Sequence, residues 1–353
     1  MEKNNKTLNV PNLRFPEFSG EWDVMELQDI APNICSGRDK PSHNGKVILY
    51  GSTGVIGMTE SASYLDELIL VARVGANAGQ LQVANSPCGV TDNALVINAH
   101  EWNAYIYYYL QYYNLNRLVF GSGQPLITGG MLKKIKIKSG KNVERLKITH
   151  LLSLLDQRIE TQKKVIEDLK RLKYAISKRV FAEMGQHHPV VKLGQLCSIK
   201  TGKLDANAMI DNGEFPFFTC AREDYRTDTY AFEGDSLLIS GNGDIGIVKR
   251  YNGKFNAYQR TYVLQDFIQE IAYVQCFVEH HLPKRVLKEK NVGAMPYIVL
   301  STLSEMPIIL PPTYIQNAIC KAIGTISEQI NVEEKILANF ELQKQYNLSM
   351  MFI

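Results

Sequence analysis

Two segments of the chain share a hydrophobic pattern that predicts long helices. Residues 143–183 contain neither Gly nor Pro, and their apolar positions step by four and three; residues 314–353 repeat that spacing. A seam sustained over more than four heptads is typical of a coiled coil. The predicted seam positions are Ile148, Leu152, Leu155, Ile159, Ile166, Leu169 and Ile176 in the first helix, and Ile319, Ile323, Ile326, Ile330, Leu337 and Phe340 in the second.

Each seam is interrupted twice by a polar residue, at Gln162 and Lys173 in the first helix and at Glu333 and Lys344 in the second. If the two halves of the chain are related by a rotation, the second helix must run back toward the first domain, so the pair should pack antiparallel. The register that brings Lys173 to Glu333 also sets Gln162 beside Lys344. We therefore hypothesise that polar layers fix the register of the pair.

The remaining sequence has the pattern of mixed α/β domains. Short β-branched runs at residues 46–51, 68–74, 93–97 and 134–138 are separated by Gly, Asn and Ser turns, which predicts strands. Residues 102–120 predict one helix in the first domain, and residues 267–286 predict its counterpart in the second.

An internal repeat relates the two domains. Leu27, Ile30 and Gly37 resemble Leu193, Leu196 and Gly202. Gly79 and Gly246 both end a strand-like run and lie 167 residues apart, and the same shift sets residues 91–97 on residues 258–264. Residues 121–137 match residues 292–308 at a shift of 171. A nearly constant shift indicates a duplicated unit.

The predicted organisation is a first domain at residues 1–142, a long helix at 143–186, a second domain at 187–313 and a second long helix at 314–353. A helix of nearly 40 residues spans about 55–60 Å, longer than a small domain needs. DNA half-sites one helical turn apart lie about 34–36 Å from centre to centre. Two diverged domains on such a spacer therefore suit a split, asymmetric DNA site.

The composition restricts the classes of protein to which the chain can belong. The 353 residues carry a net charge of only +3, so a DNA-binding face must be a local patch. No apolar run reaches the roughly 18–20 residues of a membrane span, and the start of the chain lacks a signal-peptide pattern. The six cysteines show no C-x-x-C spacing, which disfavours structural zinc or a disulfide framework and favours the reducing cytoplasm.

Catalytic motifs are missing from the sequence. Residues 120–123 resemble a methyl-donor loop but follow a helix-like segment, and no Asn/Asp-Pro-Pro-Tyr/Phe motif occurs. A phosphate-binding G-x-x-x-x-G-K-[ST] loop is also missing. The pairs His187–His188 and His280–His281 have no second ligand cluster, so we expect linker and surface histidines and no metal site. We expect no enzymatic activity and no cofactor in this chain.

The order of these parts resembles the specificity subunit of type I restriction–modification enzymes along nearly the whole chain. The local resemblances lie at residues 13–30, 69–79, 121–137, 151–160 and in the terminal Met350–Ile353. The resemblance implies α/β (α+β) target-recognition domains in pseudo-two-fold tandem, joined by two long helices in an antiparallel coiled coil. The second domain departs from the first, because its SGNGDIG loop lacks the arginine found at Arg73.

The same resemblance implies partners. These are double-stranded DNA, two modification subunits that carry S-adenosylmethionine and methylate adenine, and, where present, restriction subunits that use ATP and Mg²⁺. Membrane association is not expected. Exposed leucines on the first helix, such as Leu146, Leu151 and Leu172, could dock the modification subunits or pack on the chain's own domains.

Candidate DNA contacts lie in glycine-containing loops, where a backbone can approach a duplex closely. Arg suits guanine, Asn and Gln suit adenine, and Lys mostly meets phosphate. The candidates are Arg38, Lys40, Ser52, Thr53, Arg73, Asn77, Ser122 and Gln124 in the first domain, and Lys203, Arg222, Arg226, Asn242, Lys249, Arg260 and Lys290 in the second.

Two other classes of function compete with this interpretation. One is a methyltransferase or nuclease that recognises its own target, and the other is a coiled-coil adaptor without DNA specificity. Methyl transfer by the isolated chain would favour the first. Failure to bind duplex DNA at low ionic strength would favour the second.

Overall fold

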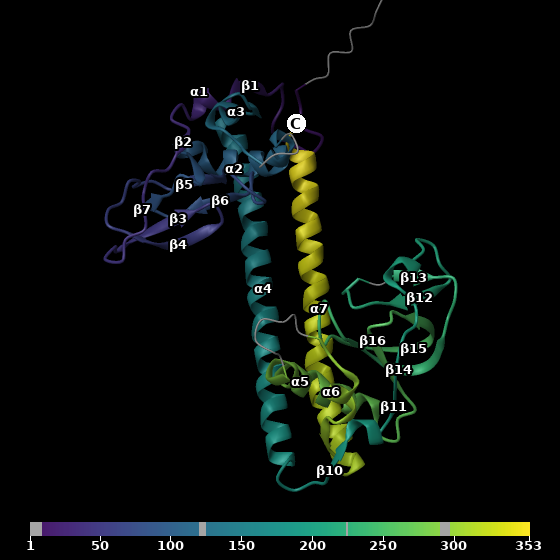
Figure 1. Ribbon diagram of the computed structural model, residues 1–353. Helices are drawn as coiled ribbons and strands as arrows, with labels where there is room; N and C mark the ends of the chain where they lie inside the picture. The colour runs from purple at the N-terminus through teal and green to yellow at the C-terminus, as the bar shows by residue number, and fades with distance from the viewer. Residues whose placement is uncertain (1–8, 120–124, 224, 290–296) are drawn as a thin grey trace, which may run out of the picture. The chain divides into compact units, whose positions relative to one another are not determined.

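The computed structural model describes residues 9–119, 125–223, 225–289 and 297–353. The chain forms two compact units, and the first of them combines two segments that are distant in sequence. Unit 1 consists of Met1–Lys163 and Lys335–Ile353, and unit 2 consists of Lys164–Glu334. Both long helices contribute to both units (Figure 1).

Unit 1 is a mixed α/β domain with three small sheets. The four-stranded sheet has the order β2-β8-β5-β6, the second β4-β3-β7, and β1 pairs with β9. The strands are β1 (Asp23–Glu26), β2 (Cys35–Ser36), β3 (Val47–Gly51), β4 (Gly54–Thr59), β5 (Leu68–Ala72), β6 (Leu81–Ala84), β7 (Cys88–Val90), β8 (Ala94–Ile97) and β9 (Lys136–Ser139). The helical segments are α1 (Leu27–Ile30), η1 (His100–Trp102), α2 (Asn103–Tyr113), η2 (Leu115–Leu118), α3 (Gly129–Lys133) and the start of α4 (Asn142–Met184).

Unit 2 contains a six-stranded sheet of order β11-β16-β14-β15-β12-β13, and a separate β10–β17 pair. The strands are β10 (Val190–Lys192), β11 (Ser198–Thr201), β12 (Phe215–Phe218), β13 (Tyr225–Thr227), β14 (Phe232–Ser240), β15 (Val248–Ala257), β16 (Thr261–Gln265) and β17 (Pro307–Ile309). The helical segments are η3 (Leu193–Gln195), η4 (Ala206–Ala208), α5 (Ile271–Glu289), α6 (Leu300–Ser304) and the start of α7 (Thr313–Met351).

The two units repeat one topology. The order β2-β8-β5-β6 of unit 1 recurs as β11-β16-β14-β15 in unit 2. Gly79 and Gly246, which the sequence pairs, both adopt positive φ, at 91° and 75°. A Cβ at Gly37 would collide with the carbonyl of Val90, and one at Gly202 with that of Ala257, so both positions require glycine. These details agree with the internal repeat of the sequence.

One predicted element is shorter than expected. The sequence pattern predicts a helix over residues 102–120, whereas α2 ends at Tyr113. Asn114 there adopts a left-handed conformation, with φ 55° and ψ 88°, and the chain continues as the short η2 turn. A short polar side chain tolerates this conformation and terminates the helix despite the apolar residues that follow.

The core of each unit is completed by the end of a long helix that begins in the other unit. In unit 1, Phe352, just past α7, packs against Tyr105 and Tyr109 with ring centroids 5.4 and 5.6 Å away. In unit 2, Phe181 of α4 packs against Tyr273 and Phe277 at 6.3 and 4.9 Å. Both phenylalanines are at most 2% exposed. The two aromatic clusters therefore occupy equivalent places.

The long helices pack together and run antiparallel within each unit. In unit 1, Asp156 and Lys163 of α4 pair with Lys344 and Glu341 of α7 at 2.6 and 3.2 Å. Residue numbers therefore increase along α4 in the direction in which they decrease along α7, so the two helices are antiparallel. Of the seam positions, Ile148, Leu152, Leu155, Ile159, Ile166, Ile319, Ile323 and Ile330 are buried, and Leu169, Ile176, Ile326, Leu337 and Phe340 are partly buried.

The two lysines that interrupt the seams form ion pairs outside the hypothesised Lys173–Glu333 and Gln162–Lys344 layers. The Lys173 ammonium lies 2.9 Å from Glu279, a residue of α5. The Lys344 ammonium lies 2.6 Å from Asp156 on α4, which also accepts a hydrogen bond of 2.8 Å from Tyr108. Glu279 on α5 and Tyr108 on α2 belong to helices of the globular domains. These polar partners therefore come from outside the pair of long helices.

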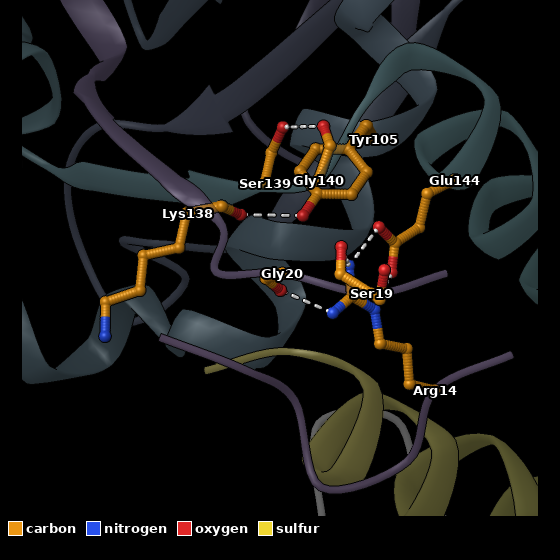
Figure 2. A network of polar contacts seen from close by, with 8 residues as sticks. All are labelled: Arg14, Ser19, Gly20, Tyr105, Lys138, Ser139, Gly140 and Glu144. Carbon is orange, nitrogen blue, oxygen red and sulfur yellow. Dashed lines mark hydrogen bonds and ion pairs between the residues drawn. The ribbon is translucent and has the colours of Figure 1, made fainter. Parts of the chain in front are cut away.

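An N-terminal segment fastens the start of α4 in unit 1 (Figure 2). The guanidinium of Arg14 donates to both carboxylate oxygens of Glu144, at 2.7 and 2.9 Å, and to the carbonyl of Gly20 at 2.6 Å. Glu144 is 1% exposed, and a carboxylate so deeply buried requires a charged partner. The Leu13 N–H also donates to the Met350 carbonyl at 2.8 Å, which ties this segment to the end of α7.

The histidines of α5 correct one expectation. His280 is 9% exposed and packs against Phe181, while His281 stacks on Phe277 with ring centroids 4.2 Å apart. The pair therefore belongs to the core of unit 2 instead of its surface.

No helix in the described ranges is long and apolar enough to cross a membrane.

Phe352→Ala should destabilise unit 1 by roughly 3–5 kcal/mol, because it removes a buried aromatic ring and leaves a cavity. Phe181→Ala should do the same to unit 2. Amide hydrogen exchange should accelerate in α2 for the first variant and in α5 for the second. Tyr346→Ala removes a ring that is 55% exposed and should leave both helices protected. Equal acceleration in α2 and α5 for either variant would contradict separate cores.

Candidate nucleic-acid interface

Three candidate loops of unit 1 converge on the turn at residues 91–93, which joins β7 to β8. The Asp39 N–H donates to the Val90 carbonyl at 3.0 Å, and the Thr91 N–H donates to the Tyr50 carbonyl at 3.0 Å. The Arg73 N–H donates to the Asn93 carbonyl at 2.9 Å. Backbone bonds alone therefore gather the loops that follow β2, β3 and β5 at one end of the domain.

The loop after β2 presents its cations outward. Asp39 turns inward, where its carboxylate accepts hydrogen bonds from the Val90 N–H at 2.8 Å and from the Ser63 hydroxyl at 2.5 Å. Arg38 and Lys40, on either side of it, are exposed. Within the described residues, neither cation has a hydrogen bond or ion pair. An anchored acidic residue between two unpaired cations suits contact with an anionic ligand.

The other candidates of unit 1 occupy the neighbouring loops. Thr53 is exposed and Ser52 is partly buried at the β3–β4 turn, which the Gln82 amide pins by donating to the Gly51 carbonyl at 2.7 Å. Asn77 is exposed in the loop that follows β5. The Gly75 N–H donates to the Pro125 carbonyl at 3.1 Å, so Pro125 lies at the same end. Ser122 and Gln124 themselves lie outside the described residues.

Unit 2 builds the equivalent arrangement around the turn at residues 258–260. The Tyr258 N–H donates to the Phe218 carbonyl at 2.9 Å, and the Gln259 N–H donates to the Leu204 carbonyl at 2.9 Å. The Gly241 N–H donates to the Arg260 carbonyl at 2.9 Å. Lys203 and Arg260 are exposed beside this turn, and Asn242 is partly buried.

The remaining cations of unit 2 are engaged within the protein. Arg226 donates from its guanidinium to the Gly213 and Glu214 carbonyls, at 2.6 and 2.7 Å. Arg222 lies 3.6 Å from Asp244, and its carbonyl accepts a hydrogen bond of 2.8 Å from the Lys249 ammonium. Lys290 lies outside the described residues. Lys203 and Arg260 are thus the exposed candidates of unit 2 with no partner among the described residues.

Sequence reasoning missed Asp92, Asn93 and Gln259, which are exposed on the two turns at the centre of these loops. The signal was present in the repeat, since residues 91–97 align with residues 258–264. At the aligned positions the backbone is conserved between the units, while the polar side chains differ. Among the described residues, no group of three or more His, Cys, Asp or Glu side chains could hold a metal ion.

The geometry defines a class of protein: two domains of one topology, each joined to a long helix, and each presenting polar loops of different chemistry at the same end of its sheet. Comparison with known proteins identifies the family. The family described as "Type I restriction modification DNA specificity domain" matches twice, at residues 19–171 and 188–342. The chain belongs to this family of type I restriction–modification specificity subunits.

Curated relatives agree. The chain is 35% identical to the type I restriction enzyme EcoDI specificity subunit of Escherichia coli over 140 residues, which cover 40% of this chain and 31% of the relative. It is 29% identical to the MpnII specificity subunit of Mycoplasma pneumoniae, over 42% of this chain and 47% of that one. It is 22% identical to the MjaIX specificity subunit of Methanocaldococcus jannaschii over 89% of both chains. The aligned regions thus span less than half of the first two relatives.

The fold is also found in a solved structure. A crystal structure of a type I restriction–modification S subunit from M. genitalium superposes with a TM-score of 0.68 at 17% identity, covering 98% of this chain and 99% of that one. At this identity the likeness establishes the fold of two recognition-domain-like regions with paired long helices.

Arg226→Ala should destabilise unit 2 by about 1 kcal/mol, because the Gly213 and Glu214 carbonyls, just before β12, lose their donor. Arg38→Ala removes a side chain without a described partner and should change stability by less than about 0.5 kcal/mol. Thermal unfolding of the two variants would measure this difference. A larger loss of stability from Arg38→Ala than from Arg226→Ala would contradict the assignment of structural and free arginines.

Proposed function

We propose that this chain recognises a bipartite, gapped DNA sequence and directs adenine methylation, and restriction where a restriction subunit is present, by partner subunits. The observation that carries the proposal is the double match to the DNA specificity domain, one on each unit. The equivalent loops differ in side-chain chemistry, so each unit recognises a different half-site. The intervening base pairs are not contacted and form the gap.

The loops around the two turns would make the contacts. Arg38, Lys40 and Lys203 are exposed cations suited to phosphates, which fix the position of a protein on a duplex. Arg73, Asn77, Asn242 and Arg260 are suited to base edges, where bidentate hydrogen bonds distinguish one base pair from another. Ser52 and Thr53, at a hairpin tip, can contact either. Arg222, Arg226 and Lys249 would have to exchange their present partners to take part.

Two modification subunits would dock on the long helices and supply S-adenosylmethionine; restriction subunits would supply ATP hydrolysis. Leu146 and Leu172 are 56% and 48% exposed on α4, and they suit such an interface. Leu151 instead packs against the core of unit 1. We place the complex in the cytoplasm, a compartment that suits six free cysteines.

Methylome sequencing of cells that express this chain with its modification subunit tests the proposal. We expect adenine methylation at a two-part motif with a gap of fixed length. Replacing residues 188–312 with the matching segment of another family member should change one half of the motif and leave the other half and the gap unchanged, since unit 1 is untouched.

The control is a chain with an unexchanged second domain, expressed with a modification subunit that cannot transfer methyl groups; it should give no new methylation. A continuous motif, or a change in both halves after the exchange, would contradict the assignment of one half-site to each unit.

A further inference from the structure

Each unit has one arginine at an equivalent backbone hydrogen bond, as the donor residue in unit 1 and as the acceptor residue in unit 2. In unit 1 the donor is the Arg73 N–H at the end of β5, and the acceptor is the Asn93 carbonyl. In unit 2 the equivalent bond runs from the Gly241 N–H, at the end of β14, to the Arg260 carbonyl, and both bonds measure 2.9 Å. The arginine is therefore on the strand side in unit 1 and on the turn side in unit 2.

The equivalence of the two positions does not depend on this bond alone. The Arg73 carbonyl accepts from the Ile127 N–H at 2.9 Å, and the Gly241 carbonyl accepts from the Ile298 N–H at 2.8 Å. Residues 127 and 298 differ by 171, the shift at which the sequence aligns this part of the repeat. The strand end is thus held on both sides by equivalent neighbours in the two units.

Unit 2 cannot carry an arginine where unit 1 has Arg73. A Cβ at Gly241 would lie 2.5 Å from the carbonyl oxygen of Arg260, too close without a backbone shift. The absence of this side chain accompanies a cavity of about 230 Å³ beside the turn, lined by Gly241, Gln259, Arg260, Tyr262 and Ile298. Arg260 borders this cavity and is exposed. A cation on the 258–260 turn thus takes the place of the one that the end of β14 cannot carry.

Arg260 is exposed and Arg73 is partly exposed. Neither the Arg73 nor the Arg260 guanidinium has a hydrogen bond or ion pair within residues 9–119, 125–223, 225–289 and 297–353. Only their backbone atoms serve the fold, through the bonds given above. An arginine without a structural role, beside the turn where the candidate loops meet, fits recognition better than stability.

We infer that Arg73 and Arg260 are equivalent specificity-determining residues, each recognising a guanine in the half-site of its own unit. This inference rests on the proposed function. The planar guanidinium donates two parallel hydrogen bonds, which match the O6 and N7 acceptors of guanine in the major groove. Two arginines at the two ends of equivalent backbone hydrogen bonds, neither with a side-chain partner among the described residues, would give each half-site one fixed G·C pair, while the differing neighbours Asp92 and Gln259 would distinguish the flanking bases.

Competition binding with the full chain assembled with its modification subunits tests the inference. The probes are duplexes that carry the methylated motif, with every single base-pair change in each half-site. Arg260→Lys keeps the charge but not the bidentate geometry. It should lose about 5- to 150-fold discrimination at one G·C pair of the half-site assigned to unit 2, and keep discrimination elsewhere. Arg73→Lys should do the same in the other half-site.

Arg250→Lys is the matched control, because the Arg250 guanidinium is already held by Asp235 through hydrogen bonds of 2.9 and 2.5 Å. The base preferences of this variant should be unchanged.

Full discrimination at every position in both the Arg73→Lys and Arg260→Lys variants would overturn the inference while leaving the proposed function intact. Discrimination lost at a base pair other than G·C would overturn the guanine assignment, as would a uniform loss of affinity with a weaker salt dependence, which indicates phosphate contact. A wild-type complex without a bipartite preference would overturn the proposed function itself, and the inference with it.

Discussion

Each globular core in this chain needs an aromatic side chain from a helix that starts in the other unit. The ring of Phe352, at the end of α7, fills the tyrosine cluster of unit 1, and the ring of Phe181, near the end of α4, fills the equivalent cluster of unit 2. Unit 1 therefore combines Met1–Lys163 with Lys335–Ile353, whereas unit 2, Lys164–Glu334, is continuous and includes the end of α4. The constraint also requires antiparallel helices, because each helix must start in one core and end in the other.

The local parts of this architecture are predictable from the sequence. The heptad pattern predicts which helix positions are buried, because burial along a helix depends on a periodicity of a few residues; Ile148, Leu152, Ile319 and Ile323 are all buried, within the cores of the units. Constant shifts in the repeat identify equivalent glycines because a positive φ, or a close approach to a carbonyl, leaves few other choices. These are constraints that act at single positions.

The polar contacts depend on elements that the sequence does not place. Lys173 binds Glu279 because α5 packs beside α4, and no pattern within α4 indicates that neighbour. The burial of His280 has the same cause. The candidate loops meet through backbone bonds between residues that are distant in sequence, such as Thr91 and Tyr50. Side-chain type therefore suggests candidates, but it does not distinguish Arg260, whose guanidinium has no partner among the described residues, from Arg226, whose donors are already used.

Because the backbone is duplicated, one set of main-chain hydrogen bonds presents different side chains in the two units. Joined antiparallel helices would then set the distance between the two half-sites. The direct test is to insert one heptad in α4 after Lys164 and one in α7 after Glu334, which lengthens the pair by about 10 Å. Methylome sequencing should then show both half-sites unchanged and the gap longer by about three base pairs. An unchanged gap, in a complex that still methylates its sites, would contradict the account.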